Sequence, residues 1–202
     1  MASTAGCDAR GMRHFPIVSL GLIASLALLS ASCSPPWTVI VKSGPPSALA
    51  AVQQFSVAAD RSQMMVGDHS LNDELANRDP EEQQALLEAI AGMETSFAAG
   101  FSAQSRMPTL PATTAPMPNE ARITIRWTYV DPGKYVFVYA RDSVITARIL
   151  FTVGATVVDE IEITRSVDAN RRQGSIVERL NIGGDTIGRL AGKYVAQVRA
   201  GG

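Results

Sequence analysis

Histidine is the side chain on which many hydrolytic and metal-dependent sites depend, and this chain has two, His14 and His69. A Ser-His-Asp or Cys-His site needs a histidine as its base, and a zinc site needs three or four ligands at close spacing. His14 directly precedes an apolar run, and His69 lies in the polar sequence VGDHSLND, which is typical of an exposed loop. We therefore expect His69 to be a surface residue, and we predict no catalytic or metal site.

The remaining candidates for acid and base chemistry are the carboxylates of one predicted strand, Asp159, Glu160 and Glu162. A pair of carboxylates flanking a scissile bond would serve glycoside hydrolysis. Because successive strand residues point to opposite faces of a sheet, Glu160 and Glu162 are expected to share a polar face opposite Ile161 and Ile163. A solvated sheet face is the more ordinary interpretation, so no catalytic residue is assigned and the protein is not predicted to be an enzyme.

Arginines on neighbouring predicted strands offer partners for these acids. Arg122, Arg126 and Arg148 could meet them across strands, and each such pair would stabilise a sheet by about 0.2–1 kcal/mol. The chain has no glycine-rich phosphate-binding motif of the Walker or dinucleotide type. The sequence GGDTIG from Gly183 has the look of a glycine loop, but it follows no predicted strand. We therefore expect no cofactor.

The N-terminal part of the chain has the organisation of a secretory signal peptide. Phe15–Leu29 is an apolar run, Arg13 lies shortly before it, and small residues at 30–32 follow it. The run is shorter than the roughly 20 residues of a membrane-spanning helix. We predict that residues 1–32 are a cleaved signal peptide. Met12 is favoured as the true start, because the residues before it carry no apolar pattern.

Cys33 directly follows this segment, and the arrangement resembles the lipobox of bacterial lipoproteins, in which the cysteine is acylated and becomes the mature N-terminus. A lipobox usually has leucine three places before the cysteine, whereas here Ser30 holds that place and Leu29 lies one further back. Residues 30–32 also fit ordinary secretion, which would leave Cys33 free. Cys7 is removed with the signal peptide, so Cys33 has no partner for an internal disulfide. Lipidation of Cys33, for example by palmitate, is the favoured interpretation.

Such an anchor would place the protein in the cell envelope, facing the periplasm or the cell surface, with the membrane as a partner. The formal net charge is −1 over 202 residues, which gives no electrostatic footprint for nucleic acid. We expect residues 33–36 to be a tether. The length of the remainder suits one domain, so residues 37–202 are expected to fold as a single unit.

Hydrophobic periodicity predicts an α+β domain. The expected strands are Trp37–Lys42, Ala51–Ala58, Arg122–Val130, Val144–Val153 and Val157–Thr164, with a short strand or bend at Tyr135–Tyr139. The expected helices are Pro80–Ser102 and Ser175–Arg199. Asp60–Asn77 is expected to be irregular, and the prolines within residues 107–119 indicate an extended loop. The expected fold is a mixed or antiparallel sheet of about four to five strands with two helices packed on one face.

Two patterns within these elements mark buried faces. The apolar residues that alternate with polar ones in the strand from Arg122 are Ile123, Ile125, Trp127 and Tyr129. In the C-terminal helix, Gly184, Gly188 and Gly192 recur every four residues. Such a strip would let this helix lie close against a sheet or another helix, although the neighbouring glycine at 183 also permits a kink.

The order of several segments resembles that of a family of uncharacterised bacterial envelope lipoproteins. The segments are WTVIVKSGPPSALAAVQQFSV, METSFAAGF, VDPGKYVF, VVDEIEIT and RLNIGGDTIGRLAGKYVAQV. The resemblance covers most of the chain from Ser34 to Val198. It implies an envelope location and an α+β fold, but it implies no reaction.

Two classes of function follow from these expectations. The first is a non-catalytic envelope component that binds a partner protein or a lipid through an exposed sheet edge or a helix groove. The alternative is a hydrolase that acts on envelope polymers. A pair of acids assembled in a cleft would favour the hydrolase, whereas a smooth polar sheet face and an exposed strand edge would favour the binding component.

Overall fold

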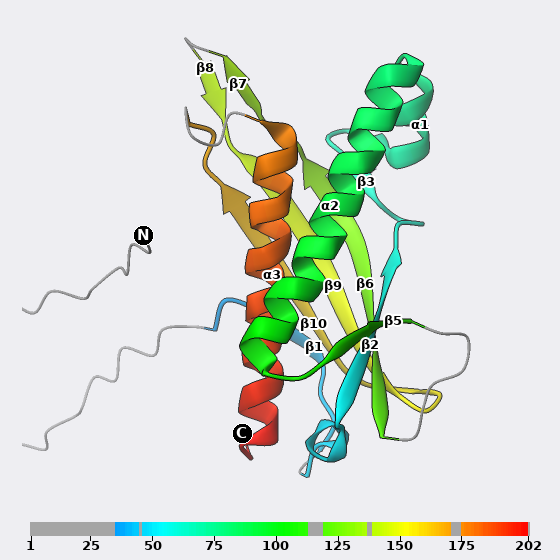
Figure 1. Ribbon diagram of the computed structural model, residues 1–202, viewed down its shortest axis with the longest axis vertical. Helices are drawn as coiled ribbons and strands as arrows, with labels where there is room; N and C mark the ends of the chain where they lie inside the picture. The colour runs from blue at the N-terminus through cyan, green and yellow to red at the C-terminus, as the bar shows by residue number, and fades with distance from the viewer. Residues whose placement is uncertain (1–34, 45, 113–118, 137–138, 171–174, 202) are drawn as a thin grey trace, which may run out of the picture. The chain divides into compact units, whose positions relative to one another are not determined.

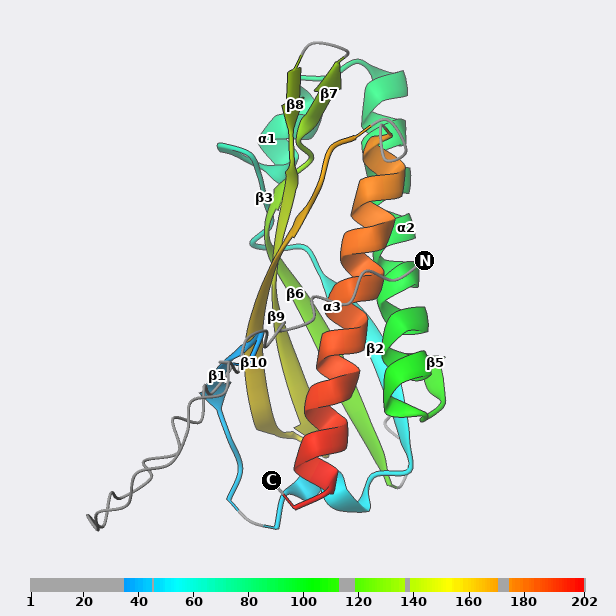
Figure 2. The ribbon, with the colours of Figure 1, turned by 90° about the vertical axis from the view of Figure 1, so that its left-hand side faces the viewer.

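A mixed β-sheet forms one layer of the fold, and two long helices form the other (Figures 1 and 2). This computed structural model describes residues 35–44, 46–112, 119–136, 139–170 and 175–201. Pro35–Gly202 is one compact unit by itself. The predicted signal peptide, Cys33 and part of the proline-rich segment lie outside the described residues, so what the sequence indicates about them stays a prediction.

Six strands follow one another across the sheet in the order β1, β10, β9, β6, β2 and β5. Their bounds are β1 Thr38–Val41, β10 Thr156–Val167, β9 Ser143–Val153, β6 Glu120–Asp131, β2 Gln54–Asp60 and β5 Thr109–Pro111. From β1 to β6 the neighbours are antiparallel, whereas β2 pairs parallel with both β6 and β5. The short strands β3 Met65–Val66 and β4 His69–Ser70 complete an eight-stranded sheet. A separate pair is formed by β7 Lys134–Val136 and β8 Tyr139–Arg141.

The predicted α+β class and mixed sheet are confirmed, but the predicted number of strands is wrong. The sheet has eight strands among the described residues, because β3, β4 and β5 are too short to show an alternating pattern in sequence. The segment expected to be irregular contains a helix, α1 Leu71–Ala76. The strand expected from Ala51 begins at Gln54, after a single 3-10 turn over Ala48–Ala51.

Both long helices begin where their capping residues predict. In α2, Pro80–Ser105, the Asp79 carboxylate accepts a hydrogen bond of 2.9 Å from the Glu82 backbone N–H. In α3, Ile176–Arg199, Ser175 caps the first turn, and the helix continues without a break through its paired glycines. The two helices cover one face of the sheet and leave the other open (Figure 2). Their buried side chains therefore share one core with the inner face of the sheet.

The core differs from the sequence pattern at one place in β6. Ile123, Ile125 and Trp127 are fully buried as their alternation predicts, but Tyr129 is only half-buried. The pairing with β9 shifts between Trp127 and Tyr129, and such a bulge moves the following residues to the other face. Val130 takes the buried position instead.

The glycine strip of α3 lies directly against the backbone of α2. A Cβ atom added at Gly184 would collide with the Met93 carbonyl oxygen, and one at Gly192 would lie 2.9 Å from the Phe101 carbonyl oxygen. These contacts confirm that the strip permits close packing, and they identify the neighbour as a helix. The close approach brings α2 and α3 together side by side.

Candidate binding surfaces

The histidine and the acids singled out in the sequence do not come together in the structure. His69 is exposed in β4, where its backbone pairs with Val66. No group of three or more potential ligands among the described residues could hold a metal ion. In the same part of the chain, no helix is both long and apolar enough to cross a bilayer.

The acids of β10 lie on opposite faces of the sheet. Glu160 and Glu162 are half-buried on the open face, whereas Asp159 is fully buried on the helix face. Arg148 lies opposite Glu162 in β9. Its Nε donates to Glu162 Oε2 at 2.9 Å, and its Nη1 lies 4.0 Å from Glu160 Oε1. The hydrogen bond to Glu162 and then the nearby negative charges raise the pKa of Arg148.

The cross-strand partner expected for these acids is therefore confirmed for Arg148 but not for Arg126. Arg126 instead donates to Asp60 Oδ2 of β2 at 3.1 Å. Hydrogen bonds from Ser62 and then Arg126 lower the pKa of Asp60. On the open face, Asp60, Glu160 and Glu162 therefore each lie beside an arginine, and none of the three is a free carboxylate.

Asp159 has a structural role. Its burial could have been predicted, because it alternates along the strand with Ile161 and Ile163 and so shares their face. Its Oδ1 atom accepts hydrogen bonds from the Ser43 backbone N–H at 2.7 Å and from the Ser43 hydroxyl at 3.0 Å. Beside it, burial and then the charge of Asp159 raise the pKa of Tyr194 in α3. The Tyr194 ring lies 5.8 Å from the Trp37 ring in an edge-on contact. This cluster fixes both ends of β1 to the rest of the domain.

The outer edge of β1 is the first candidate binding surface. Val39, Ile40 and Val41 have exposed fractions of 41%, 43% and 40%, although all three are aliphatic. Val157, at the start of β10, is also exposed. Among the described strands, β1 pairs with β10 alone, so its other side is an open edge. Exposed apolar residues grouped at a sheet edge are typical of an interaction surface. We call Val39, Ile40 and Val41 the β1 patch.

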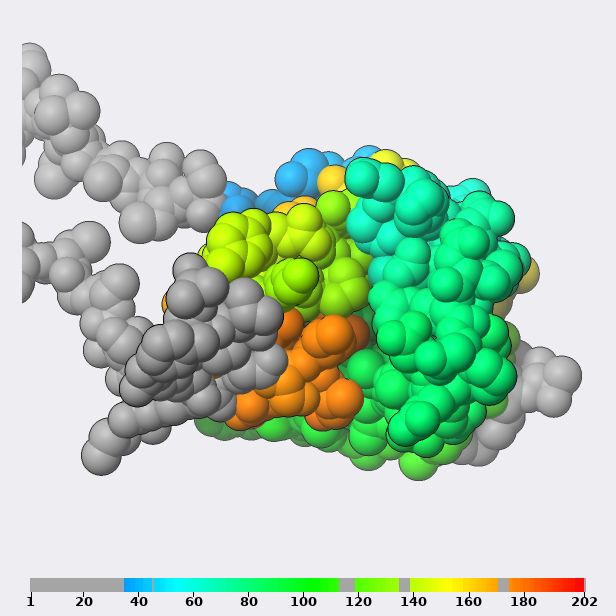
Figure 3. All heavy atoms as spheres, turned by 90° about the horizontal axis from the view of Figure 1, so that it is seen from above, coloured from blue at the N-terminus to red at the C-terminus, as the bar shows by residue number. Residues whose placement is uncertain are grey.

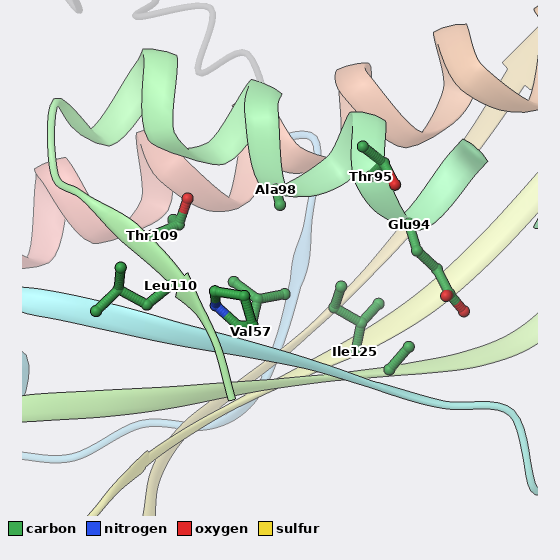
Figure 4. A pocket seen from close by; sticks show the side chains of 9 residues that line it. Val57, Glu94, Thr95, Ala98, Thr109, Leu110 and Ile125 are labelled. Atoms are coloured by element: carbon green, nitrogen blue, oxygen red, sulfur yellow. The ribbon is translucent and has the colours of Figure 1, made fainter. Parts of the chain in front are cut away.

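The second candidate is a groove at the opposite edge of the sheet, between α2 and β5. Its volume is about 320 Å³, near the lower limit for ligand pockets. The lining residues are Val57, Ala59, Glu94, Thr95, Ala98, Thr109, Leu110, Pro111 and Ile125. Figure 4 shows Thr109 and Leu110 at one end and Glu94 with Ile125 at the other. Beyond the lining, Arg61 binds Glu94 with a closest distance of 2.6 Å. The groove can hold a small apolar group, and its one acidic residue already has a partner.

A third apolar region lies where α2 and α3 begin, and Figure 3 views the molecule from this end. A smaller cavity there, of about 150 Å³, is lined in part by Leu86, Pro132, Ile176 and Val177. Val177 is 44% exposed. Residues 171–174, shortly before this helix, lie outside the described part of the chain, so we use Val177 only as a reference position for the β1 patch.

The fold and these surfaces define an α+β domain with an open mixed sheet and an apolar edge strand. No protein-family model and no curated protein matches the chain. Among solved structures, the PelC dodecamer from Paraburkholderia phytofirmans is similar at 13% identity and a TM-score of 0.40, covering 76% of this chain and 97% of that chain. A point variant of that protein in another crystal form gives 15% identity and a TM-score of 0.38, over 81% and 97% of the two chains. These likenesses concern the fold alone.

Proposed function

We propose that this protein is a lipid-anchored component of the cell envelope, acylated at Cys33, which acts by binding rather than by catalysis. Its partner is an envelope protein or a lipid, and the exposed sheet edge at β1 is the binding surface. The observation that carries the proposal is the β1 patch, in which three consecutive aliphatic residues are each about 40% exposed. This patch begins only a few residues after Cys33.

The arrangement of the acids supports binding over the alternative, a hydrolase of envelope polymers. Asp159 lies on the buried face and holds Ser43, while Glu160 and Glu162 share Arg148 on the open face. A hydrolase needs one carboxyl group kept protonated as an acid and a second one free to act. Arg148 forms ion pairs with both glutamates, so neither carboxylate is free to act as a nucleophile or base, and this face is poorly suited to that chemistry.

The anchor is tested by expressing the full chain and its Cys33→Ala variant in a bacterial host. The mature protein is expected to begin at Cys33, to carry acyl chains in its intact mass and to sediment with membranes. Cys33→Ala should release the protein from membranes or block its processing. Cys7→Ala is the matched control, because Cys7 lies in the predicted signal peptide, and it should leave the mature protein unchanged. A mature N-terminus without acyl chains would remove the lipoprotein proposal.

A further inference from the structure

We propose that the β1 patch lies against the surface of the lipid bilayer, which makes lipid the partner of this edge. The inference rests on the proposed acylation of Cys33. It goes further because it assigns a membrane-facing side to the domain. Three features carry it, namely the length of chain between Cys33 and the domain, the apolar character of the patch and the shape of β1.

The chain between the anchor and the folded domain is short. Trp37 is already part of the core, with an exposed fraction of 8% and its ring against Tyr194. Four peptide steps separate it from Cys33, and a fully extended chain spans about 3.5 Å per residue. The point at which the chain leaves the core is therefore within about 14 Å of the acylated residue. The edge of the sheet that contains β1 must stay near the headgroups.

The β1 strand cannot swing away from this position independently of the domain. Trp37 holds its start through Tyr194, and Asp159 holds its end through the two hydrogen bonds from Ser43. When β1 lies in one orientation at the membrane, the whole domain is therefore held in that orientation as well.

The chemistry of the patch suits a lipid surface. Val39, Ile40 and Val41 present exposed aliphatic side chains. The charged groups near β1 balance, because Glu160 and Glu162 of its partner β10 both bind Arg148 of β9 and the exposed Lys42 after the strand supplies a second positive charge. Such a surface neither requires anionic lipid nor is repelled by it, so contact should depend little on salt.

The shape of β1 favours this partner over an added protein strand. An added strand needs a regular row of backbone groups, but β1 has four residues and its register shifts between Val39 and Val41. Short length and a bulge are the features by which natural edge strands resist pairing. Contact with lipid needs only apolar side chains and no backbone register.

The test places a fluorophore on the patch in the acylated, full-length protein. Ile40→Cys and Val177→Cys form a matched pair, because both replace a β-branched residue of nearly equal exposure, 43% and 44%. Cys33 remains for acylation, and the new thiol takes the label. The purified proteins are reconstituted into phosphatidylcholine vesicles, with and without phospholipids that carry a nitroxide quencher on the headgroup. We expect a loss of fluorescence in quencher vesicles for the label at position 40 and no loss at position 177.

Flotation of the vesicles and the intact mass of the protein are measured on the same samples. Protein that floats, carries acyl chains and is quenched at position 40 alone supports both the anchor and the contact. If the protein floats but is not quenched at position 40, or is quenched equally at both positions, the proposed anchor stands and the proposed contact of the β1 patch with lipid is contradicted. Protein without acyl chains that fails to float overturns the anchor and the contact with it.

Discussion

Gly188 of α3 lies directly beneath the carbonyl oxygen of Phe97 in α2, with no space for a side chain between the two backbones. Glycine in a helix interior costs about 1 kcal/mol relative to alanine. The helices here approach so closely that alanine would have to displace backbone. Gly188 therefore weakens α3 as an isolated helix but permits α3 to pack closely against α2.

The first prediction follows from this contact. Gly188→Leu should lower the free energy of unfolding by roughly 1–3 kcal/mol through overpacking, as measured by urea and thermal unfolding. Gly44→Ala is the control, because nothing lies within 4 Å of a Cβ at Gly44, and its effect should stay within about 0.5 kcal/mol. A leucine variant that is more stable than the parent would contradict close packing at Gly188.

The second prediction concerns the attachment of β1. Ser43→Ala removes the hydroxyl that donates to Asp159 and should lower stability by about 0.5–1.5 kcal/mol. Amide hydrogen exchange in β1 should become faster than in β9, because Ser43 then holds Asp159 through its backbone N–H alone. Ser166→Ala, at an exposed position of β10, is the control. Equal exchange in the two variants would show that Asp159 does not hold the strand.

The third prediction is a dependence of stability on alkaline pH. Burial and the charge of Asp159 raise the pKa of Tyr194 above its ordinary value of 10.0. The folded state therefore keeps its proton at pH values where the unfolded state loses it. Tyr194 contributes its full stability below pH 10 and loses that contribution as the pH rises above 10. Tyr194→Phe should flatten this alkaline decline in the unfolding free energy, and an unchanged slope would contradict the assignment.

The fourth prediction concerns the open face of the sheet. Glu160→Gln together with Glu162→Gln should change stability only slightly, because exposed ion pairs contribute little, and Arg148→Gln should behave alike. Unfolding at low and high salt checks this. The same proteins are incubated with isolated envelope polymers, and the release of new reducing ends is measured. Release by the parent that disappears in the double variant would restore the hydrolase alternative.

Long periodic elements were predictable from the sequence, and short or irregular ones were not. The alternation in β9 and the capped stripe of α2 are local patterns, so their existence follows from the residues themselves. The bulge that exchanges Tyr129 for Val130 depends on pairing with β9, which no local pattern contains. The three-residue β5 exists because β2 offers it an edge.

The candidate surfaces were predictable only in part. The pairing of Arg148 with Glu162 could be expected from strand positions. The partner of Asp159 could not, because Ser43 is distant in sequence. The exposure of the β1 patch follows from the sheet order, which puts a strongly apolar strand at an edge. A sequence pattern alone would place such a strand in the centre.

That sheet order also has a consequence for the way the chain folds. The first two strands of the chain, β1 and β2, flank the antiparallel strands β10, β9 and β6, which are synthesised later. Thr38 pairs with Glu162 and Gln54 pairs with Glu120, so neither early strand has a partner nearby in the chain. Closing such long loops is entropically costly and slow. During synthesis from the N-terminus both strands therefore emerge unpaired, and the sheet can close at β1 only after β10 has left the ribosome.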